Sequence, residues 1–230
     1  MGKTGRKAGQ EYDRYIEVSE SGTRKNLPHL GPLLPQMDGR RIADIGCGVG
    51  LLLEGYAKNN YTLGLDSNKK SLQSAKRRGI HVKLHDLEKP LPIPSNSFDL
   101  VICKDVLEFI FNAGQLLSEM ARIARPGGQV LLQVSNPFTV RELLSYALGA
   151  GLLKKRWYAD STELTNPHVR FFTRKNLINS LEGKGLYVAK DYSSMWGFII
   201  PGTGAMVPLL SGISPEFFSP GITLLCVKRG

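Results

Sequence analysis

The stretch Arg41-Ile42-Ala43-Asp44-Ile45-Gly46-Cys47-Gly48-Val49-Gly50 is the most informative part of this chain. It begins as an apolar run typical of a strand and ends in glycines at alternate positions, and a segment of helical character, residues 51–58, follows at once. Glycine has no Cβ, so the backbone can turn tightly and a ligand can lie against the main chain. The amides at the start of the following helix face the same loop. A nucleotide-like ligand is therefore the first hypothesis.

The spacing of the glycines disfavours two common nucleotide-binding loops. A dinucleotide fingerprint requires G-x-G-x-x-G, but the third glycine here is Gly50, and Leu51 stands where that fingerprint needs glycine. This counts against NAD or FAD. No Gly-Lys-Ser/Thr sequence follows the loop, so a Walker-type phosphate loop is absent too.

Two acidic residues downstream suggest a nucleoside held at both ends. Asp66 closes the predicted second strand, where a carboxylate can accept both hydroxyls of a ribose; a carboxylate that stabilises a helix N-terminus is the alternative. Asp86 follows the predicted third strand and is placed to meet the far end of the nucleoside, with Leu87 offering an amide to a base. For Asp86, the alternative is a loop aspartate that caps its own backbone.

From residue 41 onward, strands alternate with helices. We expect strands at 42–46, 61–65, 81–84, 98–103, 129–134, 185–190 and 222–228, and helices at 51–59, 67–78, 113–124, 140–153 and 173–183. Ser67 or Asn68 should cap the second helix, and Gly79 should end it. Alternation of this kind is typical of βαβ units and a parallel sheet.

Length and cysteine content narrow the class of protein. A chain of 230 residues fits one domain, or one domain with insertions. The three cysteines are far apart and form no CxxC pair, so neither a metal site nor a disulfide framework is expected, and we predict buried reduced thiols. The basic N-terminus is followed by no apolar core of a secretory signal, which favours a cytoplasmic location.

The net charge of +10 favours anionic partners such as nucleic acid, phosphorylated substrates or a membrane surface. Basic runs occur at Lys69-Lys70, Lys76–Arg78 and Lys154–Arg156. Ordinary solvated helix faces are the alternative explanation. The apolar stretch Trp196–Phe218 is interrupted by Gly and Pro and is too broken for a transmembrane segment. We expect it to cover a site, or to form a surface that faces a membrane or a partner.

Taken together, the motifs resemble the class I S-adenosylmethionine-dependent methyltransferases, in the branch of ubiquinone/menaquinone-biosynthesis and methionine-biosynthesis-like enzymes. The motifs are, in order, Asp44–Gly50, Asp66, Asp86-Leu87, Phe98–Val101 and Arg125–Gly128. The resemblance covers residues 40–136 closely and extends loosely to His168–Thr173 and to the last two strands. The ordered set is far more specific than any single motif.

The resemblance implies an α/β fold, a three-layer αβα sandwich around a mostly parallel seven-stranded sheet. The implied strand order is 3-2-1-4-5-7-6 with the last strand antiparallel, and insertions follow strands 5 and 6. Residues 1–40 would form an N-terminal helical cap or substrate lid on a methyltransferase domain, 41–230. Within that domain, 41–136 would be the cofactor half, and 137–172 and 193–219 would be substrate-side insertions.

The resemblance also implies that S-adenosylmethionine is bound, with S-adenosylhomocysteine as the product and no metal. Asp44 would approach the amino group of the methionine moiety, Asp66 would bind the ribose, and Asp86 would accept from the adenine amino group. Lys104 and Asp105 would flank the sulfonium. The full expected set of cofactor-binding residues is Asp44, Gly46, Cys47, Gly48, Gly50, Asp66, Ser67, Asp86, Leu87 and Lys104.

Methylation of an oxygen can require a general base. Asp105 and His168 are the catalytic candidates that we name, and Glu108 and Tyr15 are further ones; each could equally be a hydrogen-bonded structural residue. Tyr15 and Arg170 are the candidate substrate contacts.

Family members that methylate exocyclic amines of bases or a glutamine side chain tend to carry Asn/Asp-Pro-Pro-Tyr/Phe after the fourth strand. This chain has Cys103–Val106 there. The similar Ser135–Phe138 follows the fifth strand instead and is expected to form a turn. The motif for methylation of such amines is therefore missing from its usual place.

Three functions remain open from the sequence. The first is a methyltransferase that acts on oxygen or carbon of a small molecule, with an acidic, phosphorylated or lipid- or quinone-like acceptor. The second is an RNA or protein methyltransferase that uses the basic surface, although nucleic acid is not the favoured partner because no RNA-binding module is recognised. The third is an S-adenosylmethionine-binding protein without catalysis. A monomer or a homodimer would suit any of them.

Overall fold

The computed structural model describes residues 24, 34–149, 168–195, 198–199, 206–207 and 212–230. Its strands are β1 (Arg41–Ile45), β2 (Tyr61–Asp66), β3 (His81–Leu84), β4 (Phe98–Lys104), β5 (Ala124–Ser135), β6 (Leu186–Asp191), β7 (Phe198–Ile199), β8 (Met206–Val207) and β9 (Gly221–Lys228). The α-helices are α2 (Leu51–Glu54), α3 (Lys69–Arg77), α4 (Ala113–Ile123), α5 (Val140–Ala147), α6 (Arg174–Glu182) and α8 (Pro215–Phe218). Two short 3₁₀ helices also lie within the described ranges, η2 (Leu107–Phe109) and η4 (Ser193–Met195).

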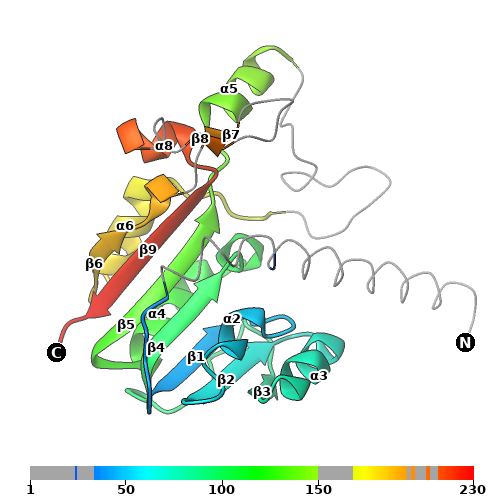
Figure 1. Ribbon diagram of the computed structural model, residues 1–230. Coiled ribbons are helices and arrows are strands. Elements are labelled where there is room, and N and C mark those ends of the chain that lie inside the picture. Colours follow the sequence, from blue (N-terminus) through cyan, green and yellow to red (C-terminus); the bar gives the residue numbers. More distant parts are fainter. Residues whose placement is uncertain (1–23, 25–33, 150–167, 196–197, 200–205, 208–211) are drawn as a thin grey trace, which may run out of the picture. The chain divides into compact units, whose positions relative to one another are not determined.

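Seven of these strands form one sheet in the order β3-β2-β1-β4-β5-β9-β6, and β7 pairs with β8 (Figure 1). β2 is parallel to β1 and β3, and β4 is parallel to β5. β9 is antiparallel to β5 and β6. Since β6 and β9 are the sixth and seventh strands of this sheet along the chain, the order 3-2-1-4-5-7-6 with an antiparallel last strand is confirmed.

The chain divides into two compact units, Met1–Asp86 and Leu87–Gly230. In the first unit, Ile45 pairs with Leu65 in the β1–β2 register, and Asp66 pairs with Leu84 in the β2–β3 register. Parallel strands with these registers end at the same edge of the sheet. The loops that follow β1, β2 and β3 therefore emerge together.

The start of α3 is determined by its cap. The side chain of Asn68 accepts hydrogen bonds from the Lys70 and Ser71 N–H groups, which have no carbonyl partner within the helix. Leu72 and Ala75 are buried against the strands. Asn68, the second of the two expected caps, is thus confirmed.

The helix after the glycine loop is shorter than expected. It was predicted to reach residue 59, but α2 ends at Glu54 and turns follow. Gly55 lowers the helix propensity at this point. Tyr56 then turns inward, and its hydroxyl donates to the Pro35 carbonyl at 2.7 Å. An anchored tyrosine and a glycine together end the helix early.

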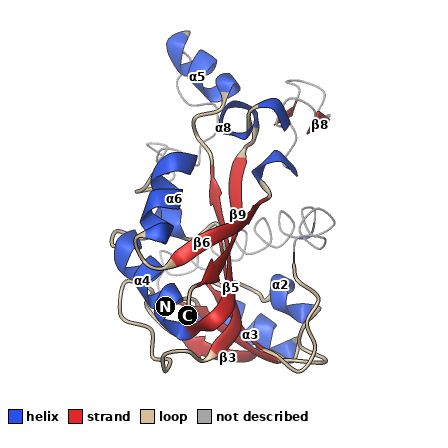
Figure 2. Ribbon diagram, turned by 90° about the vertical axis from the view of Figure 1, so that its left-hand side faces the viewer, coloured by secondary structure: helices blue, strands red, loops and turns tan. Residues whose placement is uncertain are grey.

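In the second unit, α4 and α6 pack beside one another next to β4, β5 and β6 (Figure 2). The side chain of Thr173 accepts from the Asn176 N–H and caps α6, the helix that was predicted over 173–183. The largest fully buried side chains of this unit include Phe98, Leu100, Ile102, Leu107, Leu116, Leu117 and Met120.

Two boundaries in this unit differ from the prediction. Residues 125–128 were expected to separate a helix from a strand, yet they lie inside β5. The register moves from Phe98–Ala124 to Leu100–Gln129, so this segment forms an irregular bulge. The helix predicted over 140–153 is α5, which ends at Ala147; residues 150–153 lie outside the described part.

The three cysteines, Cys47, Cys103 and Cys226, are buried free thiols, as expected. Among the described residues, no helix combines the length and the hydropathy that a bilayer crossing requires. Most of the predicted cap, 1–40, and part of both insertions fall outside the described residues.

Candidate functional site

The glycine loop is held in a left-handed backbone conformation. Gly46, Gly48 and Gly50 have φ values of 78°, 51° and 83°, which residues with a side chain rarely adopt. The N–H groups of Gly46 and Cys47 both donate to the Leu65 carbonyl, at 2.8 and 3.0 Å. These bonds tie the loop to the end of the neighbouring strand.

Two of the glycines serve different purposes. A Cβ at Gly50 would lie 2.5 Å from Ile80 Cδ1 and 2.8 Å from Ala75 Cβ, so glycine is needed there for the loop to pack on α3. A Cβ at Gly48 would have no heavy atom within 4 Å. Gly48 therefore leaves an open surface against which a ligand could lie.

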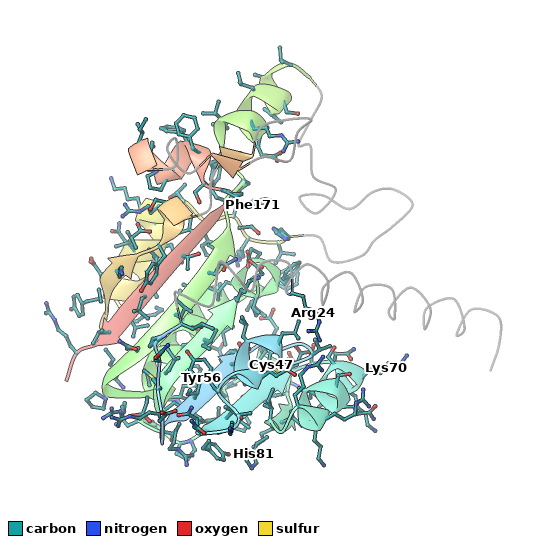
Figure 3. The ribbon with its side chains drawn as sticks, viewed as in Figure 1. Arg24, Cys47, Tyr56, Lys70, His81 and Phe171 are labelled. Carbon is teal, nitrogen blue, oxygen red and sulfur yellow. The ribbon has the colours of Figure 1, made fainter. Side chains whose placement is uncertain are left out.

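Cys47 points away from such a ligand. The side chain of Cys47, labelled in Figure 3, is buried. A Cβ on Gly64 would come within 2.5 Å of the Cys47 sulfur. Burial, with the nearby charges of Asp44 and Asp66, raises the pKa of this thiol far above its ordinary value. Cys47 thus stays protonated and packs the strands beneath the loop, so only its main chain can face a ligand.

Asp66 connects the loop to the start of α3. Its Oδ2 accepts from the Gly48 N–H at 2.9 Å, and its Oδ1 accepts from the Asn68 N–H at 2.8 Å. Burial raises the pKa of this carboxyl, and the backbone hydrogen bonds act in the opposite direction. Each carboxylate oxygen can accept more than one hydrogen bond, so Asp66 keeps acceptor capacity for a ligand hydroxyl. Ser67 beside it is exposed.

The other two strand ends of the first unit bring further residues to the same edge. Asp44 lies within β1 and is 2% exposed. Asp86 is exposed and follows His85, whose N–H donates to the Asp66 carbonyl at 3.0 Å. The structure thus gathers Gly46, Asp66 and Asp86 at one sheet edge; Leu87 begins the second unit.

In the second unit, Lys104 and Asp105 stand at the carboxyl end of β4. Asp105 has a φ of 52°, a conformation that costs a non-glycine residue energy and often marks a functional position. Its N–H donates to the Gln133 carbonyl at 3.0 Å, and its carboxylate accepts from the Lys104 ammonium and from Gln133 Nε2. These contacts hold the strained residue in place.

Glu108 is the most deeply buried acid of this cluster, at 1% exposure. One carboxyl oxygen, Oε1, accepts from the Ser135 N–H at 2.5 Å, and Oε2 has no hydrogen-bond partner among the described residues. The main-chain carbonyl of Glu108 accepts from the Val169 and Arg170 N–H groups at 2.8 and 3.1 Å. Glu108 therefore joins η2, the end of β5 and the segment before α6.

The pKa of Glu108 is raised to about 7. Burial is the main cause, and the charge of Asp105 is the second; the Ser135 N–H and Lys104 act in the opposite direction. A carboxyl group with this pKa exchanges its proton near neutral pH.

Two more predicted residues lie beside Glu108 in the same unit. His168 is 8% exposed, and its ring stands edge-on to Phe109 with 4.7 Å between the centroids. Arg170 donates from its guanidinium to the Phe111 carbonyl, at 3.1 Å from Nε. The structure thus brings Asp105, Glu108 and His168 to one region of this unit. Tyr15 lies outside the described residues.

Asn136 forms the turn that was predicted for Ser135–Phe138. Its Nδ2 donates to the Glu216 and Ser219 carbonyls, each at 2.8 Å, and its Oδ1 accepts from the Phe138 N–H at 3.0 Å. Both amide hydrogens and the oxygen are bound to main chain, so this side chain has a structural role.

The sequence did not predict that Gln133 and Ser135 would bind the side chains of Asp105 and Glu108. The one available signal was a polar residue, Gln133, inside the otherwise apolar run of β5. Within the described ranges, no group of three or more histidine, cysteine or acidic residues is arranged to hold a metal ion.

Replacing Glu108 by glutamine should change how stability depends on pH. Because the folded state raises this pKa from 4.5 to about 7, Glu108 destabilises the protein progressively as the pH rises through that interval. Glu108→Gln is neutral throughout and keeps an acceptor for the Ser135 N–H. Its free energy of unfolding should gain about 3 kcal/mol relative to wild type between pH 4.5 and pH 8. Urea denaturation across this range measures the difference.

Asp105→Asn is the matched control, because asparagine tolerates the left-handed backbone and only the charge is lost. It should lower the pKa of Glu108 and move the change in stability to lower pH. A stability difference between wild type and Glu108→Gln that does not vary with pH would contradict this account of the buried acid.

Comparison with known proteins agrees with the fold described above. Residues 43–132 match the model of a methyltransferase domain, Methyltransf_11. A ubiquinone biosynthesis O-methyltransferase from Aeromonas salmonicida is 29% identical over 164 residues, which are 68% of this chain and 66% of that protein. The enzyme of the same description from Alkalilimnicola ehrlichii is 30% identical over 117 residues, 48% of this chain and 47% of that protein. The chain thus spans about half to two thirds of the length of these relatives.

Solved structures agree on the fold across nearly the whole chain. A Haloferax volcanii methyltransferase, determined in complex with the Trm112 methyltransferase activator, superposes with a TM-score of 0.65 at 18% identity, covering 96% of this chain and 98% of that one. An S-adenosylmethionine-dependent methyltransferase from Mesorhizobium loti gives a TM-score of 0.61 at 20% identity, covering 88% and 97%. With the sheet order, these matches show that residues 43–132 carry a methyltransferase domain and that the chain has the fold of S-adenosylmethionine-dependent methyltransferases.

Proposed function

We propose that this protein transfers a methyl group from S-adenosylmethionine to oxygen or carbon of a small molecule. The observation that carries the proposal is the open loop at Gly48, whose N–H is bound by the Asp66 carboxylate. A ligand can approach the main chain at Gly48, and the Asp66 carboxylate beside it can accept hydrogen bonds from ligand hydroxyl groups. This arrangement fits the ribose and the adjoining chain of the cofactor.

The cofactor would be held by residues of several strand ends. Gly46, Gly48 and Gly50 would pass beneath it, Asp66 would bind the ribose hydroxyls, and Asp86 would accept from the adenine amino group. Asp44, Ser67, Leu87, Lys104 and the main chain of Cys47 complete the proposed set.

When bound, S-adenosylmethionine supplies an activated methyl group on a cationic sulfur. The role of the protein is to orient the acceptor and to exclude water. Orientation alone can lower the activation barrier by about 7–11 kcal/mol. Asp105 and His168 are the proposed catalytic residues, and Glu108 Oε2 is a further proton acceptor. A base with a pKa near the working pH is the most effective one, which is the reason to include Glu108.

The acceptor is proposed to lie among the segments that depart from the common core, namely the cap 1–40 and the insertions 137–172 and 193–219. Tyr15 and Arg170 are the proposed contacts; Arg170 would keep its bond to the Phe111 carbonyl while offering charge to an anionic group. The ubiquinone-biosynthesis relatives support an acidic or lipid- or quinone-like acceptor. An RNA or protein acceptor is the second candidate, supported by the net charge of +10 and by the basic residues Lys69, Lys70, Lys76 and Arg77 on α3.

Methyl-labelled S-adenosylmethionine distinguishes these acceptors. The protein and the label are incubated with a cell extract, which is then separated into solvent-extractable small molecules, RNA and protein. We expect label in the small-molecule fraction, and its loss with Asp66→Ala. Label confined to RNA or protein would replace the first candidate by the second, and label in no fraction would favour a binding protein without catalysis.

A further inference from the structure

The solvent-facing side of α3 carries positive charge along its whole length. Its exposed residues are Lys69, Lys70, Gln73, Lys76 and Arg77. They recur at spacings of three, four and seven residues, so they share one side of the helix, opposite the buried Leu72 and Ala75. The helix contains no acidic residue. Four cations and one amide thus form a continuous basic stripe.

The stability of the helix accounts for only half of this stripe. Lys76 and Arg77 lie in the last turn, where cations interact favourably with the helix dipole. Lys69 and Lys70 occupy the first turn, where the same dipole disfavours positive charge. No acidic residue lies three or four positions away within the helix to offset them. A solvated helix face therefore does not explain the two lysines of the first turn, whereas an anionic partner does.

The positive charge continues onto β3, which packs beside α3 and is the end strand of the described sheet. His81 and Lys83 on β3 are exposed. Residues 67–85, which span both elements, contain six lysines and arginines, two histidines and no acidic residue. Lys70 and His81 lie on the outside of this unit (Figure 3). We name the exposed basic residues of α3 and β3 the basic rim; they are Lys69, Lys70, Lys76, Arg77, His81 and Lys83.

A ladder of stacked side chains leads to the same edge of the sheet. The guanidinium carbon of Arg41 lies 4.4 Å from the centroid of the Tyr61 ring. The Tyr61 and His81 rings are stacked, with 4.7 Å between their centroids and 28° between their planes. Because these three residues stand on β1, β2 and β3, the ladder crosses neighbouring strands and ends at His81.

The last ring of this ladder is held in a fixed orientation. The Thr62 carbonyl lies 3.2 Å from His81 Nδ1; a carbonyl only accepts hydrogen bonds, so Nδ1 carries the proton and donates. Since His81 is exposed and no strand of the described sheet lies beyond β3, a flat group can add to the stack from outside. Nucleobases are such groups, because every base has an aromatic face.

We propose that the basic rim binds a single-stranded nucleic acid, with phosphates along α3 and one base stacked on His81. The cations alone would suit an acidic protein equally well, but the stacked ladder favours a ligand that carries flat bases. A single strand can turn an unstacked base outward, as this contact requires. The inference concerns binding alone: it goes beyond the proposed methyl transfer and holds whichever molecule accepts the methyl group.

Fluorescence anisotropy of a labelled adenine oligonucleotide, titrated with the full chain in the absence of cofactor, tests this proposal. The ribo- and deoxyribo-oligonucleotides are compared, and binding of either one supports the proposal and identifies the strand. Four phosphate contacts to a single strand predict that the affinity falls about 50-fold between about 50 and 200 mM salt. Absence of binding to both oligonucleotides at low salt would overturn the proposal.

Neutralising the stripe on α3 separates a local contact from the effect of net charge. The rim variant combines Lys69→Gln, Lys70→Gln, Lys76→Gln and Arg77→Gln. It should weaken binding at low salt at least about 50-fold and remove most of the salt dependence. Glutamine has nearly the helix propensity of lysine and arginine, so this variant should fold. The control variant makes the same change of charge in the second unit and combines Lys175→Gln, Lys184→Gln, Lys190→Gln and Arg229→Gln. It should weaken binding far less, and equal losses for the two variants would overturn the proposal.

Substitution of His81 tests whether the ligand is a nucleic acid. His81→Ala should weaken binding about 5- to 150-fold, the loss of one stacked base, and leave the salt dependence unchanged. His81→Phe keeps a flat ring and should retain the affinity. An unchanged affinity in His81→Ala, or competition by polyglutamate as strong as that by unlabelled oligonucleotide, would overturn the assignment and favour an acidic protein as the partner.

Discussion

Gly50→Ala is expected to destabilise the fold by about 2–5 kcal/mol. About 1–2 kcal/mol arises because alanine must adopt the left-handed backbone at φ 83°. About 1–3 kcal/mol more arises because the new methyl would lie 2.5 Å from Ile80 Cδ1 and 2.8 Å from Ala75 Cβ. Urea denaturation monitored by circular dichroism measures the change in the free energy of unfolding.

Gly39→Ala is the matched control for this effect. Gly39 also has a positive φ, 65°, but a Cβ there meets no heavy atom within 4 Å. It should therefore cost only the backbone part, about 1–2 kcal/mol. Adding Ile80→Val to Gly50→Ala removes the atom in closest contact and should recover part of the loss. Equal costs at Gly50 and Gly39 would mean that packing on α3 is not what requires glycine.

Asp66→Ala is expected to weaken cofactor binding by about 1–3 kcal/mol, or about 5- to 150-fold. The ligand hydroxyls would lose their acceptor. The Gly48 and Asn68 N–H groups would lose theirs as well, so the loop would be held less firmly. Calorimetric titration with S-adenosylhomocysteine measures the change, and the circular dichroism spectrum shows that the variant is folded.

Asp99→Ala provides the control for removing a carboxylate. Asp99 lies near the amino end of β4, away from the carboxyl ends that build the proposed site, and pairs with Arg125 at 2.7 Å. Its loss should leave affinity for the cofactor unchanged. An Asp66→Ala protein that is folded and binds as tightly as wild type would show that another acid holds the ribose.

The parts of the fold that follow local rules could be predicted from the sequence. Asn68 and Thr173 cap α3 and α6 because their short polar side chains satisfy the first free N–H groups. The sheet order came from the motifs through family resemblance, since periodicity alone does not determine which strands are neighbours.

Features that depend on tertiary contacts could not be predicted in the same way. α2 stops early because Tyr56 bonds to the distant Pro35 carbonyl. Residues 125–128 join β5 only because the pairing with β4 shifts. The leucines of α5 have the spacing of a core-facing helix, and only the structure shows that Glu142 and Ser145 occupy the buried side.

The candidate site also contains features that follow from local sequence and features that depend on tertiary contacts. Glycine spacing and Asp66 point to a ligand because the loop and the strand end carry their chemistry locally. The raised pKa of Glu108 depends on burial and on Asp105, and its hydrogen bond to the Ser135 N–H comes from another strand. No spacing in the sequence encodes such an environment.

Titration of the wild-type chain with S-adenosylhomocysteine in a calorimeter tests the central claim most directly. The account predicts saturable binding at one site per chain, with competition by S-adenosylmethionine and loss of affinity in Asp66→Ala but not in Asp99→Ala. Absence of binding of either compound at millimolar concentration would contradict it.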